Sequence, residues 1–336
     1  MRRTRGLHGA WMNEIVSEGN LKTALATRPA EAGQWQQRYS AAGVQLFDRT
    51  TGLNILLDEI TVPVLLHSRS PRQISIALTN RCDLTCAHCY APKSRDELRY
   101  DLVTRWLAEL DSHGALGVGF GGGEPTLYPD FVKLCQYAER ETRLSVSFTT
   151  HGHHIDGALV EELSGSVHFV RVSMDGVGPT YESIRRRPFN ELLSRLKLVR
   201  SISPFGINTV INEQTLQDLD ETAGVAEDAG ACELLLLPQI PVRSVPAATE
   251  SAINGLRRWV EAYRGALKLC INEASASGFP TCDPLVDERG LLAYAHIDAK
   301  GTLKSSSYEG TGVPIGDGSV LQALDYLAQN LLEDDT

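Results

Sequence analysis

The sequence predicts an α/β protein whose core is an open, partial (β/α)6 barrel of the TIM-like kind. It adds an N-terminal β-hairpin extension and a small C-terminal α+β extension. From about residue 73, short apolar runs alternate with segments in which apolar residues recur every three or four positions. This alternation is typical of βαβ units and a parallel sheet. Six such units fall short of the eight that close a full barrel. We therefore expect an extension over 1–72, a core over 73–240, and a C-terminal extension over 241–336 that covers the cavity.

The apolar runs and the helical recurrence of apolar residues predict the individual strands and helices of the core. Apolar runs predict strands at residues 74–78, 116–120, 144–148, 167–172, 207–211 and 233–237. Helical periods predict helices at 102–110, 131–140, 159–163, 192–202 and 216–229. Since parallel barrel strands all end at one face, residues that follow these strands are expected to share one cavity.

The extensions carry weaker patterns. In the N-terminal region we expect a helix near 11–25 and a β-hairpin over 43–57, turning at a Thr-Thr-Gly sequence. After a linker at 241–246, the C-terminal region predicts a helix near 253–263, a hairpin over 291–304 and a last helix near 321–332.

Charge and hydropathy exclude several classes of protein. The 336 residues carry 32 Lys and Arg against 42 Asp and Glu, a net charge of −10. This balance does not favour binding to nucleic acid or to an anionic membrane. No apolar run approaches the roughly 18 residues that span a bilayer, and no signal-peptide core follows the basic N-terminus. We expect a cytoplasmic protein with neither a nucleic-acid nor a membrane partner.

Three cysteines directly after the first predicted strand carry the strongest chemical signal. Cys82, Cys86 and Cys89 are separated by three and then two residues, a spacing that chance alone would give on the order of 0.3% of the time for seven cysteines. Three thiolates on one loop can hold three irons of a cubane cluster and leave the fourth open for a ligand. The alternatives are a zinc knuckle completed by His88, or buried core thiols. Zinc sites usually use two ligand pairs, and no second pair exists.

A glycine-rich turn follows the second predicted strand. Gly122 and Gly123 let the backbone approach a ligand closely, Glu124 offers an acceptor for a cationic amine, and Pro125 fixes the turn. A plain βα turn is the alternative explanation for any single glycine here.

The CxxxCxxC loop and the GGEP turn together resemble the radical S-adenosylmethionine superfamily over residues 73–240. The resemblance implies that the three cysteines hold one [4Fe-4S] cluster and that the GGEP turn binds the methionine amino group of S-adenosylmethionine. It adds further cofactor contacts at His88, Thr150, Ser173, Asp175 and Arg185. One departure is His151, which replaces the asparagine of the usual Thr-Asn-Gly segment.

The resemblance also implies an activity. One electron, from a flavodoxin- or ferredoxin-type reductant, would cleave S-adenosylmethionine at the cluster. The resulting 5′-deoxyadenosyl radical would abstract hydrogen from a substrate. We therefore expect an enzyme, either a lyase or an oxidoreductase, although no catalytic acid or base can be assigned. Tyr294, His296, Tyr308 and Glu309 are candidates because they lie in the expected cover of the cavity.

Other cysteines bear on the number of clusters. The C-terminal region resembles a SPASM/twitch extension, but Ser305 and Ser306 stand where a cysteine is expected. Only Cys270 and Cys282 remain there, and two thiolates do not make a four-cysteine site. We expect no second cluster and a packing role for these two thiols, with hydrogen donation to a product radical as the alternative. Two more, Cys135 and Cys232, are expected in the core.

The missing cysteines favour a small-molecule substrate, sugar-like or nucleoside-like, undergoing decarboxylation, epimerisation, dehydration or oxidation. The Cys-Tyr-Ala-Pro continuation at 89–92 is similar to that of cytosylglucuronate decarboxylase. Two alternatives stay open. The chain could be a maturase of a ribosomally made peptide, with residues 1–72 as a leader-binding arm, or a non-enzymatic iron–sulfur or zinc module.

Overall fold

The computed structural model describes residues 35–282, 285 and 287–334. The helix expected near residues 11–25 lies outside them. The described residues from Gln36 onward form one compact unit. The expected boundaries at 72 and 240 stay predictions.

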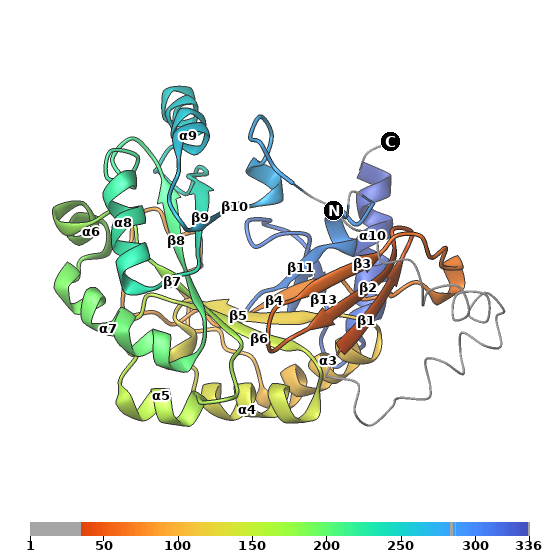
Figure 1. Ribbon diagram of the computed structural model, residues 1–336. Helices are drawn as coiled ribbons and strands as arrows, with labels where there is room; N and C mark the ends of the chain where they lie inside the picture. The colour runs from red at the N-terminus through yellow and green to blue at the C-terminus, as the bar shows by residue number, and fades with distance from the viewer. Residues whose placement is uncertain (1–34, 283–284, 286, 335–336) are drawn as a thin grey trace, which may run out of the picture. The chain divides into compact units, whose positions relative to one another are not determined.

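A ten-stranded sheet forms the centre of this unit (Figure 1). Its order is β10-β9-β8-β7-β6-β5-β4-β11-β12-β13, and every neighbouring pair from β10 to β11 is parallel. The strands are β4 (Gln73–Thr79), β5 (Gly117–Gly122), β6 (Ser145–Thr150), β7 (Phe169–Ser173), β8 (Phe205–Ile211), β9 (Glu233–Pro238), β10 (Lys268–Ile271), β11 (Tyr294–Ile297), β12 (Thr302–Lys304) and β13 (Val313–Pro314). Because β10 and β13 do not pair with each other, the sheet is an open, partial TIM-like barrel.

Helices follow most strands and lie along the outer face of the sheet (Figure 1). They are α3 (Tyr100–Ser112), α4 (Phe131–Glu141), α5 (Gly157–Leu163), α6 (Gly178–Arg185), α7 (Phe189–Ile202), α8 (Leu219–Ala229), α9 (Glu250–Ala262) and α10 (Val320–Asp334). Short 3-10 turns are η1 (Val64–Leu66), η2 (Pro125–Leu127), η3 (Glu273–Ser275) and η4 (Gly290–Leu292).

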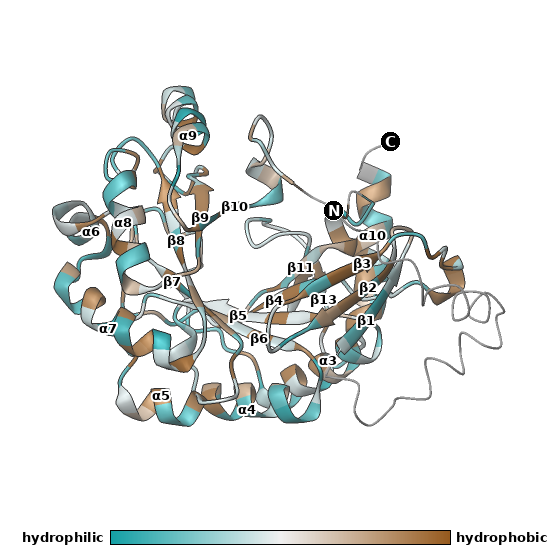
Figure 2. Cartoon of the chain, viewed as in Figure 1, coloured by the Kyte–Doolittle hydropathy of each residue, from teal (hydrophilic) through white to brown (hydrophobic). Residues whose placement is uncertain are grey.

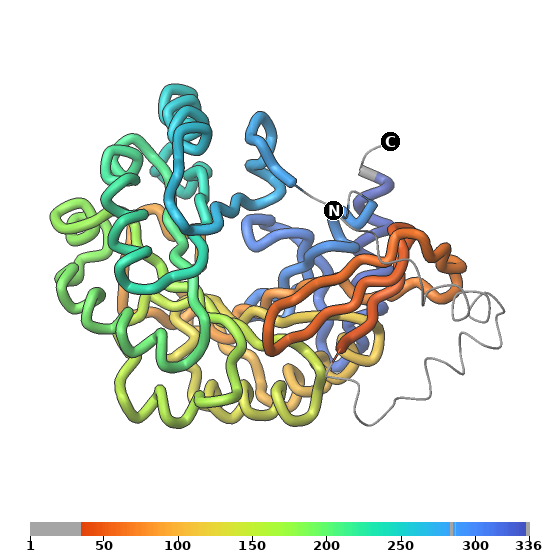
Figure 3. Tube along the Cα trace, in the orientation of Figure 1, coloured from red at the N-terminus to blue at the C-terminus, as the bar shows by residue number. Residues whose placement is uncertain are grey.

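The (β/α) alternation predicted over the core is confirmed, and two further strands join the parallel sheet. The prediction missed α6, which is eight residues long and buries only Tyr181. It also missed β10, a four-residue edge strand. The hairpin expected over 291–304 is present as β11 and β12, but β11 also pairs in parallel with β4. The blue C-terminal segment therefore runs beside the orange β4 (Figure 3).

Strand alternation separates an apolar core from a polar lumen. Ile74, Ile76 and Leu78 of β4 are fully buried, and each such side chain stabilises the fold by about 1.5–3 kcal/mol. Figure 2 shows apolar residues along the strands and mixed faces on the helices around them. Between Ile74 and Ile76, Ser75 is only partly buried and points to the other face of the sheet. The barrel therefore keeps polar side chains on its inner wall.

Two cysteines expected in the core have different surroundings. Cys135 of α4 is fully buried, as predicted. The prediction was wrong for Cys232, which is exposed. It lies after the C-terminal end of α8 and just before β9, at the rim of the sheet, where neither element covers its side chain.

The N-terminal region contains a separate three-stranded sheet of β1 (Trp35–Ser40), β2 (Gly43–Asp48) and β3 (Asn54–Leu57). The predicted hairpin is confirmed as β2 and β3. A third strand, β1, was not predicted because its sequence, Trp-Gln-Gln-Arg-Tyr-Ser, is largely polar.

A buried arginine joins this small sheet to the barrel. Arg38 is 1% exposed, and its Nε donates to Glu288 Oε1 at 2.9 Å. The same guanidinium donates to the carbonyl oxygens of Ser70, Gly114 and Leu292 at 2.8–2.9 Å. One side chain thus connects the N-terminal sheet, the start of the barrel and the C-terminal segment.

We predict that Arg38→Met lowers the free energy of unfolding by about 3 kcal/mol, because it leaves the Glu288 carboxylate buried with a weakened partner set. Arg69→Met is the matched control, since the Arg69–Asp325 pair is more than half exposed and contributes at most about 1 kcal/mol. Urea unfolding of the two variants measures the difference. Equal losses would mean that Arg38 does not hold the regions together.

Candidate cofactor site

The predicted site residues gather at the carboxyl ends of the parallel strands. The cysteine loop, residues 80–90, follows β4, and the GGEP turn follows β5. Thr150 ends β6 and Ser173 ends β7. In α/β barrels this face is where ligands bind. The topology therefore brings together the residues that the sequence singled out.

Backbone and cationic donors surround the three thiols. Leu84 N donates to Cys82 Sγ at 3.4 Å, and Lys93 Nζ lies 3.6 Å from Cys89 Sγ. Arg185 Nη1 lies 3.9 Å from Cys86 Sγ. All three cysteines are free of disulfides. Burial raises the pKa of Cys82 to about 11 and also raises the pKa of Cys86, so metal binding must displace protons from these thiols.

Close backbone contacts require glycine in the turn after β5. A Cβ atom on Gly122 would lie 2.2 Å from Thr79 O, and one on Gly123 would lie 2.1 Å from Arg81 O. Gly122 also has a positive φ of 122°. The absence of side chains lets the turn pack directly against the start of the cysteine loop.

Three acidic side chains at this site each pair with groups from several elements, and we call them hubs. Glu124 is the first. Its carboxylate is 1% exposed and accepts hydrogen bonds from Thr126 N, Thr126 Oγ1, Thr150 Oγ1 and His151 N at 2.8–3.2 Å. Four donors match the roughly four lone-pair positions of a carboxylate. Glu124 therefore fixes the end of β6 against the turn, and its direct contact with the cofactor amino group stays a prediction.

Asp175 is a second hub, after β7. It accepts from Arg185 Nε at 2.7 Å and from Val210 N at 2.8 Å, and its Oδ2 lies 3.1 Å from His88 Nε2. Burial alone would raise the pKa of Asp175, but these partners bring it down to about 2. The anion thus connects the cysteine loop, through His88, to α6 and β8.

Asp83 is a third hub, which the sequence reasoning did not identify. Its Oδ1 lies 2.9 Å from His151 Nε2 and 3.2 Å from His154 Nε2, and its Oδ2 accepts from Arg187 Nη2 at 2.6 Å. Despite partial burial, these partners hold the pKa of Asp83 well below its usual range. His151 Nε2 is also 3.3 Å from Glu124 Oε2, so the histidine that replaces asparagine connects two hubs. The sequence offered one signal for the role of Asp83, namely an acidic residue between two cluster cysteines.

The C-terminal candidates lie beside β4 and the cysteine loop that follows it. Ser75 Oγ lies 2.6 Å from both Tyr294 Oη and His296 Nδ1. Burial lowers the pKa of His296 to about 4, so this imidazole is neutral at pH 7. Tyr308 packs edge-on against Tyr90, with ring centroids 4.9 Å apart. Glu309 is exposed and contributes no described contact to the lumen.

The two C-terminal thiols also differ. Cys270 of β10 is partly buried, and its Sγ lies 3.8 Å from Glu233 Oε2. Cys282 is exposed, so the packing role expected for it is wrong. It stands in an irregular segment with no helix or strand to cover it.

The donor set fits an iron–sulfur cluster and S-adenosylmethionine. Three unpaired thiols share one loop, and cationic groups stand beside two of them. The glycine turn packs directly against the start of that loop, since Gly123 N donates to Thr79 O at 2.7 Å and Glu124 N donates to Arg81 O at 2.8 Å. The histidine that could have completed a zinc site, His88, is engaged by Asp175 instead.

Comparison with known proteins agrees with this geometry. Residues 76–226 match the family model of the radical SAM superfamily. Residues 76–226 are a radical SAM domain. The domain uses a [4Fe-4S] cluster and S-adenosylmethionine, and Cys82, Cys86 and Cys89 are the residues that would hold the cluster.

Relatives extend the comparison. An AdoMet-dependent heme synthase of Methanosarcina barkeri is 30% identical over 177 residues, half of each chain. The mycofactocin maturase MftC of Mycolicibacterium smegmatis is 29% identical over 173 residues, or 48% of this chain and 43% of the maturase. The chain spans about half the length of the curated relatives it matches. The crystal structure of Streptococcus suis SuiB shares the fold, with a TM-score of 0.71 over 89% of each chain and 15% identity.

We predict that anaerobic reconstitution yields about four irons and four sulfides per chain. Replacing Cys82, Cys86 and Cys89 together by alanine should abolish the brown chromophore, whereas Cys135→Ala, at a buried site outside the loop, should retain it. Iron and sulfide analysis measures both. A value near eight irons in the unaltered protein would contradict the expectation of one cluster.

We predict two effects for Glu124→Gln. The amide group must face one of the four donors, which lowers the free energy of unfolding by about 1–3 kcal/mol. Loss of the anion also weakens S-adenosylmethionine binding by roughly ten- to a hundredfold. Thermal unfolding and equilibrium dialysis measure the two effects. Thr126→Val, which removes one donor and keeps the carboxylate, should bind the cofactor normally. Unchanged affinity in Glu124→Gln would refute the predicted role of the turn.

Proposed function

We propose that this radical SAM protein is an enzyme that modifies a peptide, and that the N-terminal sheet helps to hold this peptide. When bound, the cluster and S-adenosylmethionine supply a 5′-deoxyadenosyl radical that abstracts hydrogen. The chain's own residues position these groups and exclude competing reactions. The observation that carries the proposal is an exposed edge strand on a sheet that is fixed to the barrel.

β3 is that edge strand. Among the described residues it pairs only with β2. Its apolar side chains are accessible, since Leu53 just before it is 52% exposed and Ile55 is 38% exposed. An unpaired strand edge of this kind binds an extended peptide through main-chain hydrogen bonds, while exposed side chains supply selectivity. Because Arg38 fixes the sheet to the barrel, a peptide held there stays tethered near the cavity.

The lumen supplies the place for the reacting residue. A Cβ atom on Gly121, at the cofactor end of β5, would meet nothing within 4 Å. Deeper in the lumen, the Arg171 guanidinium pairs with Glu233 and lies 3.4 Å from Asn208 Oδ1. The Arg171 guanidinium and the Asn208 side-chain NH2 group offer donors to a carbonyl or carboxylate oxygen.

The names of relatives support a peptide substrate. They include the mycofactocin maturase and a PqqA peptide cyclase of Ruegeria pomeroyi, which is 28% identical over 185 residues. The SuiB fold has also been crystallised with its precursor peptide SuiA.

A small metabolite is the second candidate. The polar lumen around Arg171, Ser75 and His296 suits a sugar-like or nucleoside-like compound, and Ser305 and Ser306 stand where auxiliary-cluster cysteines are expected. The reaction of such a substrate could be a decarboxylation, epimerisation, dehydration or oxidation. The enzyme would accordingly be a lyase or an oxidoreductase.

Release of 5′-deoxyadenosine tests the proposal. Reconstituted protein, S-adenosylmethionine and dithionite should give a slow background that a short peptide encoded beside the gene accelerates. Ile55→Glu should raise the apparent KM for that peptide at least tenfold and leave the background unchanged, because a charge disrupts the apolar edge. Thr51→Glu, on the neighbouring turn, is the matched control. Acceleration by a nucleoside or sugar, but not by the peptide, would favour the second candidate. No 5′-deoxyadenosine at all would refute both.

A further inference from the structure

The surface beside the cysteine loop has a charge that differs from the rest of the chain. Residues 81–99 carry four basic side chains and three acidic ones, a net charge of +1, whereas the whole chain carries −10. The basic residues are Arg81, Lys93, Arg95 and Arg99. An acidic protein that approaches this chain is repelled by most of its surface and attracted here.

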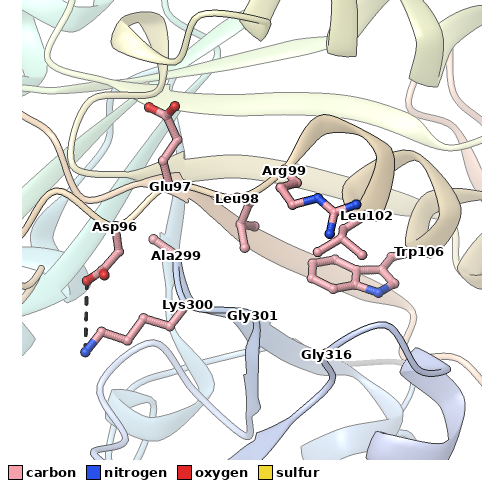
Figure 4. A pocket seen from close by; sticks show the side chains of 10 residues that line it. All are labelled: Asp96, Glu97, Leu98, Arg99, Leu102, Trp106, Ala299, Lys300, Gly301 and Gly316. Atoms are coloured by element: carbon pink, nitrogen blue, oxygen red, sulfur yellow. Dashed lines mark ion pairs between the residues drawn. The ribbon is translucent and has the colours of Figure 1, made fainter.

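This surface is concave. A hollow of about 500 Å³ is lined by Arg81, Arg95 and Glu97. A second hollow, of about 320 Å³, shares Glu97 and continues over Arg99 to Lys300 at the turn between β11 and β12 (Figure 4). Figure 4 shows Lys300 reaching toward Asp96 across this second hollow. We call the two hollows together the basic face.

The cations of the basic face differ in how they are paired. Within the part of the chain that the structure describes, Arg95 has no carboxylate partner, and neither does Lys93 beside the face. Arg99 pairs with Asp101 and Asp317, and Lys300 lies 3.9 Å from Asp96. Arg81 lies 3.8 Å from Glu97, and its side chain is 50% exposed. Such exposed pairs contribute little and are screened by salt, so they yield readily to a better partner.

The basic face lies next to the cluster ligands. Arg81 directly precedes Cys82, and Lys93 Nζ lies 3.6 Å from Cys89 Sγ. A protein docked on this face is therefore separated from the thiols by little more than the loop itself.

We propose that the basic face is the docking surface for an acidic one-electron carrier protein of the flavodoxin or ferredoxin type. The carrier loses one electron and the cluster gains it, and no bond forms or breaks in this step. The inference rests on the radical function proposed above and not on the identity of the substrate. It assigns to Arg95 and Arg81 a role in electron delivery that is separate from cofactor binding.

Charge reversal tests the proposal. Reconstituted protein is mixed with reduced flavodoxin, and bleaching of the cluster absorbance is followed by stopped flow at low and high salt. The variant Arg81→Glu/Arg95→Glu should be reduced at least tenfold more slowly at low salt, and its rate should lose most of the salt dependence seen in the unaltered protein. Binding of flavodoxin, measured by interferometry, should weaken in parallel.

Three controls separate docking from damage. Dithionite, which needs no docking surface, should bleach all variants within about twofold of one another. Arg140→Glu reverses one charge near the C-terminal end of α4, at the opposite end of the strands from the cysteine loop, and should not slow flavodoxin. Arg81→Lys/Arg95→Lys keeps the charge and should retain the fast rate.

An unaltered flavodoxin rate in the charge-reversed variant would overturn the proposal, as would a slow rate in the lysine variant. If charge reversal slows reduction by flavodoxin but not by dithionite, and 5′-deoxyadenosine never forms, the proposed function fails while the docking surface stands. If 5′-deoxyadenosine forms with dithionite and flavodoxin is insensitive to charge, only the docking surface fails.

Discussion

The cofactor site depends on three carboxylates that hold the cysteine loop against the ends of the barrel strands. Glu124 fixes β6 to the GGEP turn, and Asp175 joins His88 of the loop to β8 and α6. Asp83, inside the loop itself, engages two histidines after β6 and Arg187 after α6. Hydrogen bonds to charged groups contribute about 1.5–3 kcal/mol each. These contacts give a defined position to a loop that has no regular secondary structure.

The same carboxylates explain why the thiols need cationic neighbours. Desolvation raises the pKa of Cys82 and Cys86, and the nearby acidic groups add to this effect. Arg185 offsets it at Cys86 while it pairs with Asp175. Burial and, to a smaller extent, the anions that position the loop both raise the pKa of these thiols, and Arg185 opposes this effect at Cys86.

The sequence was sufficient for the barrel core and for the cysteine and glycine motifs, because these depend on local period and spacing. The sequence was insufficient for features that depend on contacts between residues far apart in the chain. β11 joins β4 across more than two hundred residues, and Arg38 reaches Glu288 at the other end of the chain. The position of Asp83 between two cluster cysteines marks it as unusual, but the local sequence does not predict its contact with Arg187, which is 104 residues away. The role of Glu124 as an internal hub could not be read from its motif, because Thr150 and His151 come from another strand.

Hydrogen–deuterium exchange of the cluster-free protein tests the central claim most directly. If the carboxylates hold the loop in place, amides of residues 82–89 exchange well below the unprotected rate. These amides should become rapidly exchanging in the variant Asp83→Asn/Asp175→Asn, while amides of β5 and β6 keep their protection. Unprotected exchange of the loop in the unaltered protein would contradict the account, because it would mean that the cluster, and not the three carboxylates, organises the site.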